Sequence, residues 1–184
     1  MNKWYGSLAT PWDEGQIVRM DRSPEIQDKI DGYVVGVSKL FVMLHAIDPN
    51  FINLNGYIIL RSEDIRRYRI RDDSAFFLNR ALKLKGIEPV RQPELDLSSF
   101  PALLASAQAL FPLVTIHREL MNARTCFIGR VQKLTAKTVT LEEISPSAVW
   151  NRVRRYSFRD ITRLELGGAY EESLLMVQQH QAQS

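Results

Sequence analysis

Short runs of apolar residues alternate with polar ones along most of this chain, and such a pattern predicts β-strands. In the first half we expect strands over residues 16–20, 32–48 and 57–70, the last two stretches each splitting into a pair. The second half predicts strands over residues 113–119, 124–134, 137–144, 152–161 and 162–168. The chain is therefore expected to be mostly β.

Four stretches predict helices: residues 23–30, 74–85, 100–111 and 170–181. The first is one or two turns at most. The second ends at Gly86 and the third before Pro112, residues that commonly follow a helix. The prolines between residues 87 and 97 and the lack of a clear period there predict a linker.

One pattern occurs twice. VSKL at 37–40 matches VQKL at 131–134, and EDIRRYRI at 63–70 matches RDITRLEL at 159–166, so the offset moves from 94 to 96 residues. Each copy reads as a strand, a long bent strand pair, a loop, a strand, a tight Asp-Ile corner and a last strand. Gly36 and Gly129 are predicted to let the second strand of each copy bend around a small barrel.

Residues 98–166 resemble the Sm-like fold of Sm, LSm and Hfq proteins. The resembling segments are FIGRV at 127–131, TVTLEEI at 138–144 and SFRDITRLEL at 157–166, after a leading helix. Residues 16–70 repeat the pattern without an obvious leading helix, and SH3-like barrels share such patterns. The resemblance implies two tandem five-stranded Sm-like or SH3-like small barrels with a connecting helix and a C-terminal helix. The expected organisation is a first barrel and its following helix over 1–86, a linker over 87–97, and a second barrel with its helices over 98–184.

The RNA-binding turns of that family do not match. Sm proteins usually grip RNA through an Asp-x-x-Met-Asn-like turn and an Arg-Gly-Asn/Asp turn. Here the first turn reads SKLFVM or QKLTAKTV, without Asn, and the second reads LRSEDI or SFRDI, without Gly. The uridine-type pocket is therefore not expected, since a fold alone does not confer a function.

The amino-acid composition says more about the cellular compartment of the protein than about its function. The 184 residues carry a formal charge of +3, with 14 Lys/Arg against 12 Asp/Glu in residues 1–92 and 10 against 9 in residues 93–184. This balance alone does not argue for nucleic acid. The single cysteine, Cys126, excludes an internal disulfide and fits a reducing compartment. No signal peptide or membrane-spanning run is visible, so we expect a cytoplasmic protein without a membrane partner.

Catalytic and metal-binding signals are weak. The three histidines, His45, His117 and His180, lack neighbouring ligands at metal spacing, and Cys126 is interpreted as a buried inert thiol. Asp64 and Asp160 recur at the same corner, where a side chain that accepts hydrogen bonds from the backbone explains them better than paired acid catalysis. We expect no enzyme, no cofactor and no metal.

Arginines crowd the corner of each copy. The candidate nucleic-acid contacts are Arg61, Arg66, Arg67, Arg69, Arg71, Arg154, Arg155, Arg159 and Arg163. Such rows can contact phosphates. The alternative, which we favour, is a solvated face balanced by nearby carboxylates such as Glu63, Asp64, Asp72 and Asp73.

The run from Phe41 to Ile47 is apolar on both strand faces. Val42, Leu44 and Ala46 are predicted to face outward and to form an interface with another element or another chain. The leading functional hypothesis is a non-catalytic interaction or assembly module that binds a protein partner or another copy. Binding of RNA or DNA through the arginine corners is the alternative, and a barrel regulated by a small molecule has no support beyond the fold.

Overall fold

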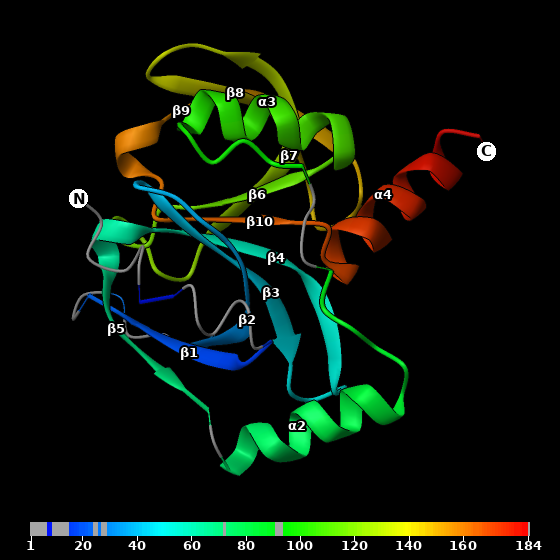
Figure 1. The fold of residues 1–184 in the computed structure, drawn as a ribbon. Helices are drawn as coiled ribbons and strands as arrows, with labels where there is room; N and C mark the ends of the chain where they lie inside the picture. The colour runs from blue at the N-terminus through cyan, green and yellow to red at the C-terminus, as the bar shows by residue number, and fades with distance from the viewer. Residues whose placement is uncertain are drawn as a thin grey trace. The chain divides into compact units, whose positions relative to one another are not determined.

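The computed structural model describes residues 7–8, 15–23, 26, 29–71, 73–90 and 94–183, and Figure 1 shows them as a ribbon. The chain divides into two compact units, Met1–Pro93 and Glu94–Ser184. This boundary falls inside the segment 87–97 that the sequence predicts as a linker. The described residues are mostly in antiparallel β-strands, with a few helices.

The N-terminal unit contains the strands β1 (Ile17–Arg22), β2 (Lys29–Val37), β3 (Phe41–Asp48), β4 (Asn53–Arg61) and β5 (Ile65–Ile70). Their order in the sheet is β5-β1-β2-β3-β4, with every pair antiparallel. The 3₁₀ turn η1 (Ser62–Asp64) joins β4 to β5, and α2 (Asp73–Leu84) follows. Four residues of the helical turns predicted over 23–30, namely 24, 25, 27 and 28, lie outside the described residues, and the prediction is wrong at Lys29 and Ile30, which begin β2.

The C-terminal unit begins with α3 (Phe100–Leu110). The strands β6 (Val114–His117), β7 (Cys126–Leu134), β8 (Thr138–Ile144), β9 (Trp150–Ser157) and β10 (Arg163–Leu166) follow, with the 3₁₀ turn η2 (Phe158–Asp160) between the last two. The strand order is β10-β6-β7-β8-β9, and α4 (Ala169–Gln181) ends the unit. Ser99 caps α3 by accepting a hydrogen bond from the Ala102 amide, as expected from the sequence.

The two units share one strand order and one pairing register. Val34 pairs with Leu44 in the first unit and Val131 with Leu141 in the second, an offset of 97 residues at both positions. The irregularities in the ladders recur at the same places, and so do the residues with positive φ in the loop after the third strand, Ile52 and Ala148. The internal repeat predicted from the sequence is therefore present in the backbone.

The glycine predicted to bend the second strand is a different one in the first unit. Gly32 and Gly129 are equivalent, because a Cβ on either would lie 2.6 Å or 2.3 Å from a carbonyl oxygen of the neighbouring strand, that of His45 or Glu142. Gly36 instead follows an irregularity of the β2–β3 ladder. Matching VSKL to VQKL misaligns the copies by three residues, since in the ladders Val37 corresponds to Leu134.

Each unit has its own buried residues. The N-terminal core cluster consists of Leu8, Val18, Met20, Ile30, Val34, Val42, Leu44, Leu60 and Ile65. The equivalent positions of the C-terminal unit are also buried and include Val114, Ile116, Val139, Leu141, Tyr156 and Ile161. On the opposite sheet face of that unit, Leu174 of α4 packs with Leu113, Ile144 and Ala148. The sheets are open in the described residues, since no pairing joins β4 to β5 or β9 to β10.

Candidate functional site

The predicted interface on β3 is part of the core. Val42 and Leu44 are fully buried and belong to the N-terminal core cluster, and Ala46 is 7% exposed. The prediction that this set is buried is confirmed, but the prediction that Val42 and Leu44 face outward is wrong, because their register partners Leu60 and Val34 lie in the same cluster. A binding partner has no access to them in the folded chain.

The other face of β3 is buried as well. His45 stacks on Tyr57 with ring centroids 4.6 Å apart, and its Nδ1 accepts a hydrogen bond from the Val90 amide at 3.2 Å. Burial lowers the pKa of His45 to about 4. The neutral ring therefore serves packing, which agrees with the structural role predicted from the sequence.

The arginines of β5 are paired with a carboxylate that the sequence analysis did not single out. Asp21 on β1 accepts from Arg67 at 2.6 Å and from Arg69 at 3.4 Å. Burial opposes ionisation of Asp21, but the hydrogen bond from Arg67 and the charges of Arg69, Arg67 and Lys29 outweigh it and lower the pKa. These two guanidinium groups already have an anionic partner.

A second ion pair lies beside the first. Asp31 on β2 takes a bidentate contact from Arg19 at 2.6 and 2.7 Å, and Arg71 approaches it at 3.9 Å. Arg19 and Asp31 face each other in the β1–β2 register, so the two strands position the pair directly. The arginine row is therefore balanced by carboxylates, as favoured above, but mainly by those of β1 and β2.

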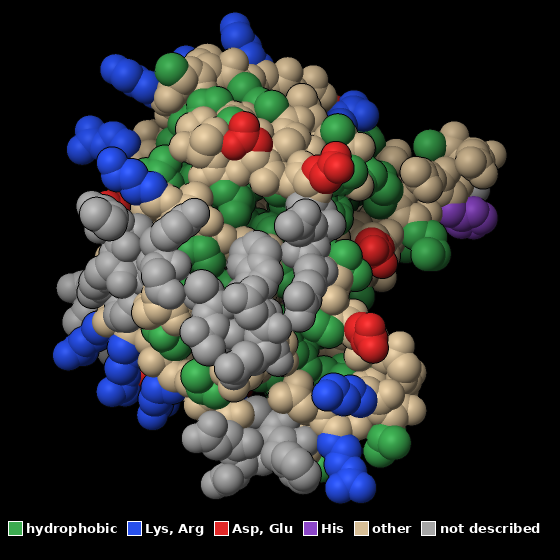
Figure 2. Space-filling model, viewed as in Figure 1, with side chains coloured by type: hydrophobic (Ala, Val, Ile, Leu, Met, Phe, Trp, Pro, Cys, Tyr) green, Lys and Arg blue, Asp and Glu red, His purple; other side chains and the backbone are tan. Residues whose placement is uncertain are grey.

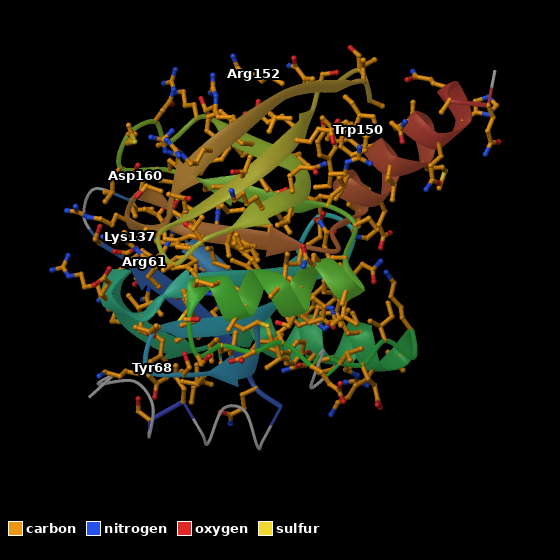
Figure 3. All side chains as sticks on the ribbon, turned by 90° about the horizontal axis from the view of Figure 1, so that it is seen from above. Arg61, Tyr68, Lys137, Trp150, Arg152 and Asp160 are labelled. Carbon is orange, nitrogen blue, oxygen red and sulfur yellow. The ribbon has the colours of Figure 1, made fainter. Side chains whose placement is uncertain are left out.

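The Asp-Ile corners use their carboxylates differently from the prediction. Asp64 closes η1 with a bidentate contact to Arg61 at 2.7 and 2.9 Å, and Arg61 also approaches Glu63 at 3.2 Å. At the equivalent position of η2, Asp160 approaches Arg118 at 3.5 Å (Figure 3). Within the described residues, both carboxylates have arginine partners and accept no hydrogen bond from the backbone. The predicted position at the corner is therefore confirmed, but the predicted backbone partner is not.

In the C-terminal unit, the buried carboxylate of Glu143 gathers the arginines of β9. Arg152 lies 3.3 Å from it and Arg154 3.6 Å, and the Tyr156 hydroxyl donates a hydrogen bond to it. Burial and the nearby Glu143 raise the pKa of Tyr156. The candidate contact Arg154 is therefore partly neutralised.

A second buried network surrounds Arg163. This guanidinium approaches Glu119 at 3.4 Å and Glu165 at 3.1 Å and lies 3.0 Å from Nδ1 of His117, whose Nε2 is 3.0 Å from Glu165. Burial opposes ionisation of Glu165, but the hydrogen bond and charge of His117 and the charge of Arg163 lower its pKa. Nδ1 of His117 therefore faces the Arg163 guanidinium and Nε2 lies within ion-pair distance of Glu165, so the ring is enclosed by this network.

Cys126 is exposed, so the prediction of a buried thiol is wrong. It pairs with His117 across the β6–β7 ladder, a juxtaposition that invites comparison with a nucleophile and its base. Desolvation and the negative charges of Glu165 and Glu171 raise the pKa of the thiol, which disfavours the reactive thiolate. This arrangement suits a thiol that is accessible but not activated.

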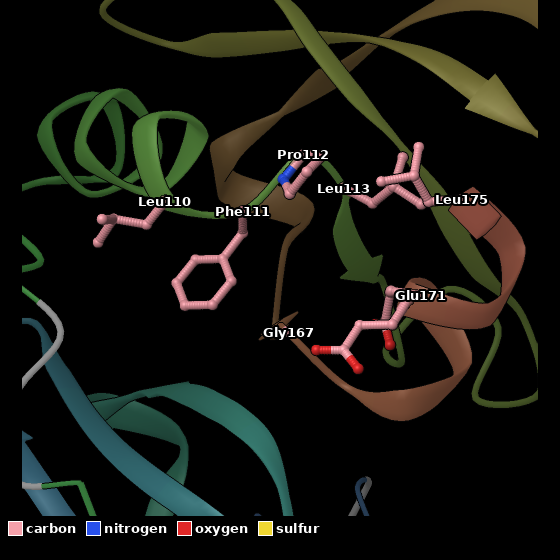
Figure 4. Close-up of a pocket in the computed structure, with 8 residues that line it drawn as sticks. Leu110, Phe111, Pro112, Leu113, Gly167, Glu171 and Leu175 are labelled. Atoms are coloured by element: carbon pink, nitrogen blue, oxygen red, sulfur yellow. The ribbon is translucent and has the colours of Figure 1, made fainter. Parts of the chain in front are cut away.

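A shallow pocket of about 170 Å³ lies between the ends of α3 and α4 (Figure 4). Its lining residues are Leu110, Phe111, Pro112, Leu113, Gly167, Glu171, Glu172 and Leu175. The carboxylate of the buried Glu171 accepts a hydrogen bond from the Thr115 hydroxyl, so it has a partner inside the unit. Glu172, the other charged residue of the lining, is exposed, so the pocket does not point to a ligand class.

The remaining arginines, Arg66, Arg155 and Arg159, are exposed.

Within the part of the chain that the structure describes, no cluster of three or more metal-ligating side chains is present, and no helix is long and apolar enough to cross a membrane. Comparisons of the chain with family models, with curated proteins and with solved structures find no match.

The three consecutive strands β7, β8 and β9 carry a concentration of basic residues. β9 ends the strand order, and with β7 and β8 it occupies residues 126–157, which contain six Lys/Arg (Arg130, Lys133, Lys137, Arg152, Arg154 and Arg155) against two acidic residues (Glu142 and Glu143). This difference of four charges exceeds the +3 of the whole chain. Figure 2 shows Lys and Arg side chains standing out from the region of these strands. The charge totals of residues 1–92 and 93–184 did not reveal this concentration, because each total averages over a whole half of the chain.

Proposed function

We propose that each unit is a small five-stranded barrel of the Sm-like type and that the tandem is a non-catalytic protein-interaction module. The identical strand orders, the 3₁₀ turn between the fourth and fifth strands, and the helix before β6 support the barrel assignment. Closure of each sheet into a barrel is part of the proposal. The cytoplasmic location expected from the sequence stays a prediction.

The observation that carries the interaction role is a set of exposed apolar side chains on the C-terminal unit. Val149, Val153, Met176 and Val177 are 54%, 61%, 69% and 47% exposed. They come from the β8–β9 turn, β9 and α4, which share the cluster formed by Leu174, Ile144 and Ala148. Large apolar groups left exposed on a unit whose own core is filled are characteristic of interaction surfaces.

The chemistry of the described side chains fits this role better than catalysis. The His117 ring is enclosed between Arg163 and Glu165, and the Cys126 thiol has a raised pKa. The pocket beside α4 lacks a nucleophile and a base at hydrogen-bond distance from each other. Binding of a protein partner to an exposed apolar surface requires neither a nucleophile nor a base.

Site-specific photo-crosslinking in the native host cell tests the proposal. A photoreactive residue at position 153 or 177 is expected to join the chain to the same protein partner. The matched control is position 63, where the Glu63 side chain is 73% exposed and belongs to the other unit. Equal labelling at all three positions, or none at 153 and 177, would refute the interaction role.

Nucleic-acid binding is the second candidate, and the basic stretch 126–157 is the observation that favours it. Arg130 lies 4.3 Å over the ring of Trp150, which places a cation and an aromatic ring near one surface, and Arg130 is also paired with Glu142 at 2.6 Å. Against it, the candidate contacts Arg61, Arg67, Arg69, Arg154 and Arg163 all have carboxylate neighbours. A log–log salt slope of about −0.7 to −0.9 per phosphate contact would identify nucleic-acid binding.

A further inference from the structure

The outer edge of β9 has backbone groups without a strand partner in the described part of the chain. The Phe158 amide donates to the Lys137 carbonyl at 3.0 Å, and the ladder pairs Ser157 with Thr138. Since hydrogen-bonded and non-hydrogen-bonded pairs alternate in antiparallel sheets, the backbone groups of Ser157, Arg155 and Val153 point away from β8. These groups form a row of donors and acceptors along the edge.

The side chains of the same residues lie on the exposed face of the sheet. Arg155 and Lys133 both pair with Thr140, one from each side, so they form a short basic row across three strands. Within the described residues, the structure shows no carboxylate at ion-pair distance from either of them. Val153, one step along the edge, is 61% exposed and supplies an apolar contact.

β5 ends the strand order of the other unit, but it differs from β9 in this respect. Its outward-facing Arg67 and Arg69 share Asp21, whereas Arg155 has no such neighbour in the described part of the chain. A second copy of the chain is also a poor occupant of β9. Pairing of β9 with β9 of another copy would place arginines opposite each other, and like charges across a ladder are destabilising. Pairing with β5 of another copy would bring β9 beside Arg67 and Arg69, two guanidinium groups that share the single carboxylate of Asp21.

We infer that the edge of β9 binds an acidic peptide in extended conformation, which adds to the sheet as a further antiparallel or parallel strand. The peptide backbone would pair with Val153, Arg155 and Ser157, and its carboxylates would lie beside Arg155 and Lys133. The arginines then have two effects: they oppose self-association at an open edge, and they select partners of opposite charge. This inference rests on the proposed interaction role and names the chemistry of its partner.

Fluorescence anisotropy tests the inference with a labelled peptide of alternating valine and glutamate, about as long as β9. The full-length chain is expected to bind it, and raising the salt concentration is expected to weaken binding. Arg155→Glu should weaken binding by about tenfold or more, because it turns attraction into repulsion beside the edge. The matched control is Arg124→Glu, an exposed arginine before β7, which should leave the affinity within about twofold of wild type.

Two further probes separate strand addition from charge attraction. The same peptide with alternate amides N-methylated keeps its carboxylates but loses the donors that pair with an edge, so it should not bind. Equal binding of the methylated peptide, no binding of the unmethylated one, or a stronger affinity for single-stranded DNA than for the acidic peptide would each overturn the inference. If photo-crosslinking at 153 and 177 finds one partner while the acidic peptide fails to bind, the interaction role survives and only this inference falls.

Discussion

His45 should make the stability of the N-terminal unit depend on pH in a predictable window. Its imidazole is 8% exposed, stacked on Tyr57 and held by the Val90 amide, and burial lowers its pKa from 6.5 to about 4. The unfolded chain takes up a proton on His45 near pH 6.5, while the folded chain stays neutral until about pH 4. The free energy of unfolding should therefore fall as the pH falls through this interval.

The size of this change in the free energy of unfolding follows from the shift in the pKa of His45. Each pKa unit corresponds to about 1.4 kcal/mol, so the full interval is worth about 3 kcal/mol. Asp21 and Glu165 have lowered pKa values, so the stability that they contribute is lost only as the pH falls below their ordinary values of 3.8 and 4.5. Measurements above about pH 4.5 therefore isolate the histidine and should capture about 2–3 kcal/mol of its effect.

Urea unfolding of the wild type and of His45→Gln, at pH values from about 7.5 to about 4.5, measures this contribution. Glutamine does not titrate, so its variant should show a flatter profile, and the difference between the two proteins should change by about 2–3 kcal/mol across the range. A constant difference at every pH would show that His45 titrates alike in the folded and unfolded chains, and the burial argument would fail.

Other predictions concern packing and access. Leu44→Ala and Leu141→Ala, at equivalent fully buried positions, should each lower the free energy of unfolding by about 2–5 kcal/mol, whereas Leu40→Ala at a 45% exposed position should change it by about 0.5 kcal/mol or less. Native-state hydrogen exchange should locate each loss in its own unit, and a small effect of Leu44→Ala would show that β3 does face outward. Gly129→Ala should destabilise by about 3 kcal/mol or more in thermal unfolding, because its Cβ would meet the Glu142 carbonyl oxygen at 2.3 Å; a melting temperature like that of wild type would contradict this packing. Cys126 should react with a maleimide in the folded chain because it is exposed, but more slowly than an exposed thiol of ordinary pKa because its own pKa is raised. Labelling only after unfolding would contradict its exposure.

Element positions could be predicted well because local signals determine them. The break at 38–39, the interruption at 62–64, the Ser99 cap and the helix stop at Gly86 all appear in the structure. The Asp-Ile corner also identified equivalent turns, since η1 and η2 end at Asp64 and Asp160. These features depend on a few neighbouring residues.

Features that depend on pairing across strands could not be predicted in the same way. Leu44 and Met43 are both apolar, so alternation alone could not say which one faces the core. The orientation of Leu44 depends on its partners Val34 and Ile58 and on the irregularities of the ladder. Asp21 gave no local sign that it binds arginines 46 and 48 residues away. The edge position of β9 likewise follows from strand order and not from its own sequence.

The shared register of the two units also constrains how this chain can change in length. The offset between equivalent residues is 96 at β1 and β6, 97 through β2 and β3, and 96 again at β4 and β5. Gene duplication followed by one insertion and one deletion, both confined to connecting loops, accounts for these numbers. A residue added inside a strand would instead exchange its inward and outward side chains. Recombinant chains that exchange whole strands between the units, such as 41–47 for 138–144, should therefore keep their buried faces, whereas exchanges shifted by one residue should not.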